Sequence, residues 1–410
     1  MTRLQINPGA EFYVTAEREL MARNTVTGTT LALSPSVLVL LSALVHPRAP
    51  HDVAADLDTR YGLDPADVLE ALAGLVDHAI LLDESAVQAA TPYFDAYGDL
   101  GIHRLMVGDA PRTDAFRRAI EAVVKPGARV LDIGCGSGIL SLFAARAGAV
   151  HVDAVDNAQI LEFAREVASD NGFDDTITFH GGDVDTLPLA GPYDVIVSEW
   201  LGHFAVIENM YAPVFRARDR LLAEGGVMIP ASVALFLAPL DDAALHARLG
   251  PALWQAPVHG FDFTRLARAT LRTATAEPAI IDPTVLLAPP AQLGEVDCRV
   301  DPTDAFHHPM NATFTVGRTG TLHGYSGHFT CDLGGGVPLD TGPGAPTTHW
   351  QQHYFPTSAL AVEAGDTLAV AFTIEHMRHG RRTPVFTLRQ TLTRGGAVVS
   401  ESTYTYNATM

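Results

Sequence analysis

Between residues 129 and 197, short apolar runs alternate with segments whose apolar residues recur at helical spacing. The runs predict strands at Arg129–Ile133, Val152–Val155, Thr176–His180 and Tyr193–Val197, with helices at Leu140–Ala147 and Leu161–Asn171. Strands that alternate with helices form a parallel sheet, because each crossover helix returns the chain to the end of the sheet at which the previous strand began. The pattern predicts a doubly wound, Rossmann-like domain, which we place at residues 89–230.

Three alternating glycines interrupt this pattern in Val130-Leu-Asp-Ile-Gly-Cys-Gly-Ser-Gly-Ile-Leu140. Gly134, Gly136 and Gly138 allow positive φ and close approach of the backbone to a ligand, and the following helix directs its N-terminal amides toward that ligand. Asp156 ends the next strand, at the spacing where an acidic residue holds ribose hydroxyls in dinucleotide-type folds. The stretch predicts a nucleotide-like cofactor, although glycines alone also occur in purely structural turns.

A separate pattern covers residues 1–88. Phe12–Arg23 predicts an extended segment, and Thr29–Leu33 predicts a strand that returns after a turn at Thr27-Gly28. Helices are expected at Val37–Val45, Val53–Tyr61 and Pro65–His78, followed by a short strand at Ala79–Leu82. A hairpin, three helices and a wing indicate a winged-helix domain.

Beyond Pro230 the pattern changes to short alternating strands with Gly and Pro turns. Examples are Ala312–Val316, Thr321–Phe329, Thr367–Ile374 and Val385–Leu392. They predict a β-barrel or sandwich over residues 231–410, and the barrel is our assignment. A helical insertion at about residues 240–275 carries Trp254 and Phe261, aromatic residues that suit an interface.

Composition limits the partners of this chain of 410 residues. Its 27 basic and 47 acidic residues give a formal charge of −20, which disfavours nucleic acid and acidic membranes and attracts cationic partners. A charge-free membrane span and a signal peptide are both lacking, so a cytoplasmic protein is expected. Cys135, Cys298 and Cys331 are far apart without CxxC spacing, so we predict neither a disulfide framework nor a metal site.

Two carboxylates follow the fourth strand in Ser198-Glu-Trp-Leu-Gly-His-Phe-Ala-Val-Ile-Glu-Asn-Met210. Ligands of parallel sheets bind beyond the carboxyl ends of the strands, where Glu199 must lie, and a looped connection would bring Glu208 to the same pocket. Facing carboxylates repel unless a cation lies between them or one takes a proton. A planar, permanently charged guanidinium would form hydrogen bonds with both carboxylates. The alternative is that Glu199 and Glu208 are two unrelated surface carboxylates that form no site.

Six segments together resemble the protein arginine methyltransferase family: YFDAYGDLGIH, MVGDAPRT, VLDIGCGSGILSLFAARAGA, SEWLGHFAVIENM, RDRLLAEGGVMIP and THW at Thr348-His-Trp350. The resemblance runs from about residue 91 to residue 410. It implies S-adenosyl-L-methionine as cofactor, a Rossmann-like domain followed by a β-barrel, and a helical arm that closes a homodimer.

The resemblance also implies roles for individual residues. The expected cofactor contacts are Tyr93, Tyr97, His103, Met106, Arg112, Asp132, Gly134, Gly136, Asp156, Val184 and Asp185, with Asp183 as the alternative to Asp185 at the adenine. Glu199 and Glu208 would hold the guanidinium, and His349 with Asp109 would accept a proton. The expected substrate contacts are Tyr97, Met210, His203 and Trp350. His203 stands where family members often carry tyrosine.

The N-terminal segment RNTVTGTTLALSPSVLVLLSAL, followed by DVAADLDTRYGLDPADVLEALAGLVDHAILL, resembles the winged-helix recognition elements of systems that modify ribosomally made peptides. In those elements a leader peptide adds a strand to an exposed sheet edge. Our leading hypothesis is N-methylation of an arginine in a precursor peptide captured by residues 1–88. Two alternatives remain: a small-molecule methyltransferase acting on free arginine or another guanidine or amine, and a non-catalytic peptide-binding scaffold.

Overall fold

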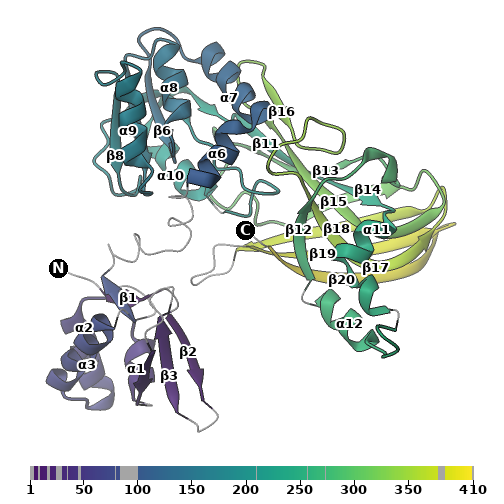
Figure 1. Ribbon diagram of the computed structural model, residues 1–410, viewed down its shortest axis with the longest axis horizontal. Coiled ribbons are helices and arrows are strands. Elements are labelled where there is room, and N and C mark those ends of the chain that lie inside the picture. The colour runs from purple at the N-terminus through teal and green to yellow at the C-terminus, as the bar shows by residue number, and fades with distance from the viewer. Residues whose placement is uncertain are drawn as a thin grey trace. The chain divides into compact units, whose positions relative to one another are not determined.

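The computed structural model describes residues 4–7, 10–15, 19–24, 30–34, 36–44, 48–78, 80–83, 100–208, 210–255, 257–272, 274–376 and 384–408 (Figure 1). The chain divides into two compact units, residues 1–100 with 157–159, and residues 101–156 with 160–410. Tyr93 and Tyr97, expected at the cofactor and the substrate, and the turn expected at Thr27-Gly28 lie outside the described residues.

The first unit contains a three-stranded antiparallel sheet in the order β2 (Ala10–Val14), β3 (Leu20–Asn24) and β4 (Thr30–Leu33). The single extended segment predicted over Phe12–Arg23 is therefore wrong, because the chain reverses inside it. Thr15 closes this turn: its backbone N–H donates to the Glu19 carbonyl at 2.9 Å, and its hydroxyl accepts from the Glu19 N–H at 3.2 Å.

Three helices follow the sheet, α1 (Val37–Ser42), α2 (Pro50–Tyr61) and α3 (Pro65–Asp77). Proline opens α2 and α3, Gly62 ends α2 at a φ of 66°, and the Asp64 carboxylate caps α3. Their leucine-rich faces form the core of the unit. The strand expected at Ala79–Leu82 is β5 (Leu81–Asp83), which pairs antiparallel with β1 (Leu4–Ile6), a strand too short for the pattern to predict.

The second unit begins at Gly101 within α6 (Leu100–Gly108), and α6 and α7 (Ala110–Val123) precede a five-stranded sheet. The sheet order is β10 (Leu222–Ile229), β9 (Tyr193–Val197), β6 (Arg129–Ile133), β7 (His151–Asp156) and β8 (Ile177–Gly181). The connecting helices are α8 (Ile139–Arg146), α9 (Leu161–Asp170) and α10 (Tyr211–Leu221). Every pairing in the sheet is parallel, which confirms the predicted Rossmann-like architecture (Figure 1).

The strand order reverses between β6 and β9. From β6 the chain passes to β7 and β8 on one side of the sheet and then returns to β9 and β10 on the other. The loops that leave the carboxyl ends of β6 and β9 therefore diverge, and the crevice between them is where such sheets bind ligands.

The remaining strands form a ten-stranded sheet. Along its path lie β13 (Ala291–Asp297), β11 (Ser232–Leu240), β15 (Gly320–Asp332), β17 (Gln352–Val362), β12 (Ala274–Ala279), β20 (Ala397–Ala408), β19 (Pro384–Arg394), β18 (Thr367–His376) and β14 (Met310–Thr315), with β16 (Pro338–Asp340) on β15. The two end strands, β13 and β14, contact each other, so the sheet curls into the predicted barrel-like fold.

The insertion after β11 is helical, as predicted. It consists of α11 (Ala243–Leu249), the 3₁₀ helix η1 (Pro251–Gln255) and α12 (Thr264–Arg272). A second 3₁₀ turn, η2 (Pro283–Val285), precedes β13. In the part of the chain that the structure describes, no helix combines the length and apolar character needed to cross a membrane.

Candidate active site

The glycine loop after β6 has the conformation that its sequence predicts. Gly134, Gly136 and Gly138 have φ values of 73°, 50° and 79°, a region that other residues rarely adopt. A Cβ on Gly134 would meet no atom within 4 Å, whereas one on Gly136 would lie 2.9 Å from Cε1 of His103. A Cβ on Gly138 would lie 3.4 Å from the Ala164 side chain. The first glycine thus presents backbone to open space, and the third permits close packing of the helix.

Two aspartates flank this loop. Asp156 accepts the Gly136 N–H at 2.7 Å, which fixes the loop against the end of β7. Asp132 is fully buried; its Oδ2 accepts the Ser141 hydroxyl at 2.6 Å, and its Oδ1 has no hydrogen-bond partner among the described residues. Burial, together with the charge of Asp156, raises the pKa of Asp132 to about 7. An orphaned buried acceptor beside an open glycine backbone fits the amino-acid end of a nucleoside cofactor.

The loop after β9, residues 198–210, is called the glutamate loop below. Its first residue, Ser198, donates its hydroxyl to the Ile133 carbonyl at 2.7 Å and so ties the loop to β6. Glu199 accepts the Leu201 N–H on Oε1 at 2.9 Å. Its Oε2 accepts from Nε of Arg112 at 3.1 Å and from Nη2 at 2.5 Å. The side chains of Arg112 and Glu199 are only 6% and 7% exposed, so this carboxylate already binds a buried guanidinium.

Glu208 lies against the same turn of the glutamate loop. A Cβ on Gly202 would lie 2.6 Å from Cγ of Glu208 and 3.2 Å from its carboxyl carbon. Gly202 directly follows Leu201, whose amide holds Glu199. The loop therefore brings both glutamate side chains against one two-residue stretch of backbone, and only glycine leaves room for Glu208 there.

Phe204 anchors the glutamate loop in the barrel. Its ring makes edge contacts with Phe355, Phe372 and Phe386, at centroid separations of 5.5, 5.8 and 5.9 Å. Phe204 has a φ of 52° and is buried, and Ala205 has a φ of 58°. Packing of this ring stabilises a backbone conformation that is unfavourable for residues other than glycine.

The second wall of the site is the segment Thr348-His349-Trp350 before β17, called the THW turn below. Oδ2 of Asp109 accepts from the His349 backbone N–H at 2.8 Å and from its Nδ1 at 2.7 Å, and Oδ1 accepts the Arg112 N–H at 3.2 Å. Burial raises the pKa of Asp109, but these hydrogen bonds outweigh it and leave the pKa below its usual range. Asp109 is therefore ionised, and Nδ1 of His349 donates its hydrogen to this carboxylate.

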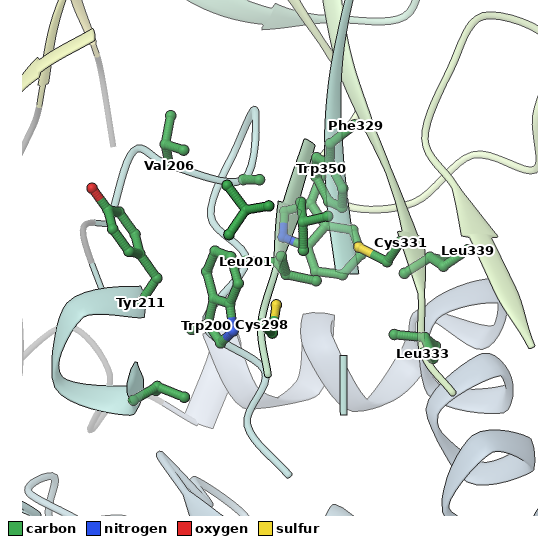
Figure 2. Packing of buried hydrophobic residues seen from close by; sticks show 14 of the residues in the cluster. Trp200, Leu201, Val206, Tyr211, Cys298, Phe329, Cys331, Leu333, Leu339 and Trp350 are labelled. Atoms are coloured by element: carbon green, nitrogen blue, oxygen red, sulfur yellow. The ribbon is translucent and has the colours of Figure 1, made fainter. Parts of the chain in front are cut away.

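Trp350 packs on the arginine of the site. Its ring centroid lies 5.9 Å from Cζ of Arg112, and it makes an edge contact of 5.2 Å with Phe329. Figure 2 shows Trp200 and Trp350 among the buried residues of the core that joins the sheet to the barrel. His203 donates from Nδ1 to the Trp350 carbonyl at 2.8 Å, a bond between the glutamate loop and the THW turn.

The remaining predicted residues lie around these groups. The Met106 carbonyl accepts from Nη1 of Arg112 at 3.2 Å, and Met210 packs partly buried at the start of α10. Val184 is buried. Asp185 accepts on Oδ2 from Nε of Arg216 at 2.9 Å, a pair that the sequence did not predict.

The acidic alternative at the adenine lies in the same turn. Asp183 accepts the backbone N–H of Asp185 at 2.9 Å. The choice between these two aspartates as the adenine contact therefore stays a prediction.

Sequence reasoning assigned Arg112 to the cofactor and Glu199 to the substrate but missed their contact. The two residues are 87 positions apart, and no local pattern records which opposite charge a buried arginine will meet. It also missed Phe204 as the anchor of the glutamate loop. A metal site was not predicted, and the described parts of the chain contain no group of three or more side chains arranged to hold one.

Comparison with known families places two matches along the second unit. Residues 130–226 match the family described as "Methyltransferase domain", and residues 231–394 match the "Arginine methyltransferase oligomerization subdomain". Protein arginine N-methyltransferase 1 of Saccharomyces cerevisiae is 36% identical over 289 residues, which cover 67% of this chain and 81% of that protein. The Dictyostelium discoideum protein of that name is 33% identical over 272 residues, which cover 65% and 79%.

Solved structures agree. A Trypanosoma brucei PRMT1 enzyme–prozyme heterotetrameric complex with AdoHcy is similar at a TM-score of 0.71 and 29% identity, covering 77% of this chain and 100% of that chain. The open conformation of Arabidopsis thaliana protein arginine methyltransferase 10 is similar at a TM-score of 0.69 and 27% identity, covering 76% and 99%. Both likenesses extend over the sheet and the barrel together.

Proposed function

Because this chain belongs to the protein arginine N-methyltransferase family, we propose that Glu199 and Glu208 bind the guanidinium of an arginine substrate in the crevice beyond β6 and β9. The chain is an S-adenosylmethionine-dependent arginine methyltransferase. One observation carries the assignment of the site: the glutamate loop holds Glu199, through the Leu201 amide, and Glu208, against Gly202, on one short stretch of backbone. Oε2 of Glu199 also accepts Nε and Nη2 of Arg112, so this carboxylate is placed where a guanidinium can reach it. A second guanidinium between the two carboxylates would gain charge-assisted hydrogen bonds from both.

S-adenosylmethionine supplies an electrophilic methyl group on a sulfonium. We assign its methionine end to Arg112, Asp132, Gly134 and Gly136, its ribose to Asp156, and its adenine to Val184 and Asp185. His103, Met106, Tyr93 and Tyr97 complete the assignment. The support for this fit is the unpartnered Oδ1 of Asp132 and the open space beside Gly134.

The two glutamates act on charge distribution. A guanidinium has a pKa above about 12, so no side chain removes its proton efficiently before reaction. Two carboxylates instead draw positive charge toward the nitrogens that they contact, which leaves lone-pair density on the nitrogen that is to be methylated. Met106 and Met210 would flank that nitrogen, and the rate then depends on holding it in line with the methyl group.

The proton released from the substrate passes to His349 in the THW turn. Nδ1 of His349 is committed to Asp109 at 2.7 Å, so Nε2 is the ring nitrogen that accepts a proton. The ionised Asp109 stabilises the imidazolium that forms. The pair thus combines an oriented acceptor with a charge that compensates the accepted proton.

Methylation of arginine peptides tests this assignment. We expect mass spectrometry to detect methyl gain on arginine, and Glu199→Gln and Glu208→Gln each to lower the rate by about a hundredfold or more. Both variants should still bind S-adenosylhomocysteine in calorimetry. Glu166→Gln, on the exposed face of α9, is the matched control and should retain full activity. Absence of methylated arginine despite cofactor binding contradicts the proposal.

We further propose that the substrate is a ribosomally made precursor peptide held by the first unit. The described part of that unit ends its three-stranded sheet in β2, which pairs on one side with β3 and exposes Phe12 and Tyr13. An extended peptide pairing with β2 would gain main-chain hydrogen bonds and contacts to these rings. Both family matches lie within residues 130–394, so the proposed peptide capture is a role that we assign to a part of the chain outside those matches.

Substitutions on β2 test peptide capture without removing the domain. We expect Phe12→Ser with Tyr13→Ser to raise KM for a peptide that carries its leader and to leave kcat unchanged. Tyr61→Ser removes an exposed ring from α2 instead and is the control. Equal turnover of leader-bearing peptide, leaderless peptide and free arginine by the unmodified enzyme would favour a small-molecule substrate.

We also propose a homodimer formed through the insertion α11–η1–α12. The segment belongs to the region that matches the oligomerization subdomain. Trp254 and Phe263 pack with a centroid separation of 5.8 Å, and Phe261 between them in sequence is 69% exposed. An exposed aromatic ring close in sequence to a packed aromatic pair is typical of an interface anchor.

A further inference from the structure

One hydrogen bond joins His203 of the glutamate loop to the backbone of the THW turn. Nδ1 of His203 lies 2.8 Å from the carbonyl oxygen of Trp350. Because a carbonyl only accepts, Nδ1 carries the hydrogen. The bond fixes the residue that directly follows His349, and on the other side His349 is held by Asp109.

From this geometry we infer that His203 is a positioning residue. Its hydrogen bond holds the THW turn in place and so keeps Nδ1 of His349 hydrogen-bonded to Asp109. The inference rests on the proposed role of His349 as proton acceptor. His203 reaches the turn from a loop whose backbone is itself fixed by the buried ring of the next residue, Phe204. Packing of Phe204 in the barrel thus holds the loop from which His203 donates.

The residue type matters because of reach. The Nδ1 atom of histidine is one bond beyond Cγ, close to the backbone, whereas the hydroxyl of tyrosine lies at the far end of its ring. With the same side-chain orientation, the hydroxyl of a tyrosine would lie well beyond the position that Nδ1 of His203 occupies. The role we assign therefore depends on the histidine Nδ1 donor.

The environment of His203 is consistent with a neutral donor. Burial lowers the pKa of His203, although the Trp350 carbonyl opposes this, and the nearby His349 adds to the lowering. The His353 ring lies 6.0 Å away on the barrel side, and burial lowers its pKa to about 3. A neutral pair at this position adds no positive charge next to the proton acceptor.

Two substitutions separate the hydrogen bond from the space that the ring fills. His203→Phe keeps a planar ring without a donor, and His203→Asn places an N–H near the position of Nδ1. Each is made in the full chain with His349 intact and in a His349→Ala background, so that a double-mutant cycle measures the coupling. His308→Phe, an exposed histidine remote in sequence from both segments, is the control.

We expect His203→Phe to lower kcat about tenfold, the factor that corresponds to one buried hydrogen bond left unmade, with unchanged affinity for S-adenosylhomocysteine. His203→Asn should restore most of the rate. In the His349→Ala background His203→Phe should have no further effect. An equal loss in both backgrounds, or no rescue by asparagine, overturns the inference and leaves a packing role.

A readout independent of turnover separates failure of this inference from failure of the proposed function. In ¹⁵N-histidine-labelled protein, the Nδ1 proton of His349 bonded to a carboxylate should give a low-field signal, assigned by its loss in His349→Ala. We expect His203→Phe to weaken that signal and His203→Asn to retain it. If the wild type methylates no arginine, the proposed function fails, and this signal still decides whether His203 positions His349.

Discussion

Replacing Asp132 by asparagine removes a carboxyl group that is completely buried beneath the glycine loop. Oδ2 of Asp132 accepts the Ser141 hydroxyl, and Oδ1 has no hydrogen-bond partner in the described structure. Burial disfavours the charged form and the charge of Asp156 adds to this effect, so the pKa rises from an ordinary 3.8 to about 7. The substitution should therefore change how stability depends on pH.

The direction in which stability changes with pH follows from the number of protons that each state binds. In the unfolded chain this carboxyl loses its proton near pH 4, whereas in the folded protein it keeps the proton up to about pH 7. Between these values the folded state binds more protons, so the free energy of unfolding falls as pH rises. A difference of about three pH units between the two pKa values corresponds to about 4 kcal/mol. This stability is fully present below about pH 4 and is lost above about pH 7.

Urea unfolding measured from about pH 4.5 to about pH 8 tests the magnitude. Relative to the wild type, Asp132→Asn should gain up to about 4 kcal/mol across this range, because the variant has no proton to lose. Asp170→Asn, an exposed aspartate at the end of α9, is the matched control and should follow the wild-type curve. The comparison between variants cancels the contributions of all other titrating groups.

The pH dependence of cofactor affinity gives a second measure of the protonation of Asp132. An amino group that binds Asp132 requires the ionised carboxylate, so the affinity of the wild type for S-adenosylhomocysteine should rise up to about pH 7 and then level off. Calorimetry in buffers of different ionisation enthalpy should detect proton release at about pH 6. Parallel stability curves for wild type and variant, together with a flat affinity profile, would refute the reasoning about Asp132.

Three other substitutions probe separate parts of the structure. Arg112→Lys keeps the charge but loses the fork that contacts Glu199, so kcat should fall about tenfold or more with a smaller change in melting temperature. Phe204→Ala removes the buried anchor of the glutamate loop and should lower the free energy of unfolding in urea by about 3–5 kcal/mol. Phe261→Asp should convert a dimer to a monomer in light scattering, and an unchanged mass would exclude that surface as the interface.

The sequence predicted strands well where apolar residues are continuous. Arg129–Ile133 and Tyr193–Val197 have the predicted bounds because both are buried strands of a parallel sheet. β10 was not predicted, since Glu224 and two glycines interrupt the apolar residues of its first half, and its pairing with β9 shifts register between Leu222 and Val227. The hairpin inside Phe12–Arg23 was missed because a Thr15 turn has no glycine or proline signal.

The site was predictable residue by residue but not as a network. The quoted segments identified Arg112, Glu199, His349 and Asp109 one at a time, each by its expected role toward the cofactor, the substrate or the released proton. Their contacts with one another depend on the crossing of two loops and a barrel turn, and periodicity says nothing about such crossings. His203 illustrates this limit: the resemblance suggested a substrate contact, and only the fold supplied the Trp350 carbonyl as its partner.

The insertion of Phe204 into the barrel has a consequence for how such enzymes diverge. The ring belongs to the loop that carries both glutamates, yet its neighbours Phe355, Phe372 and Phe386 belong to strands of the other domain. A chimera that joins this sheet to the barrel of a relative would therefore misplace the carboxylates unless the receiving aromatic cavity came with it. Substitutions in the barrel interior and substitutions in the glutamate loop are therefore expected to accumulate together during evolution.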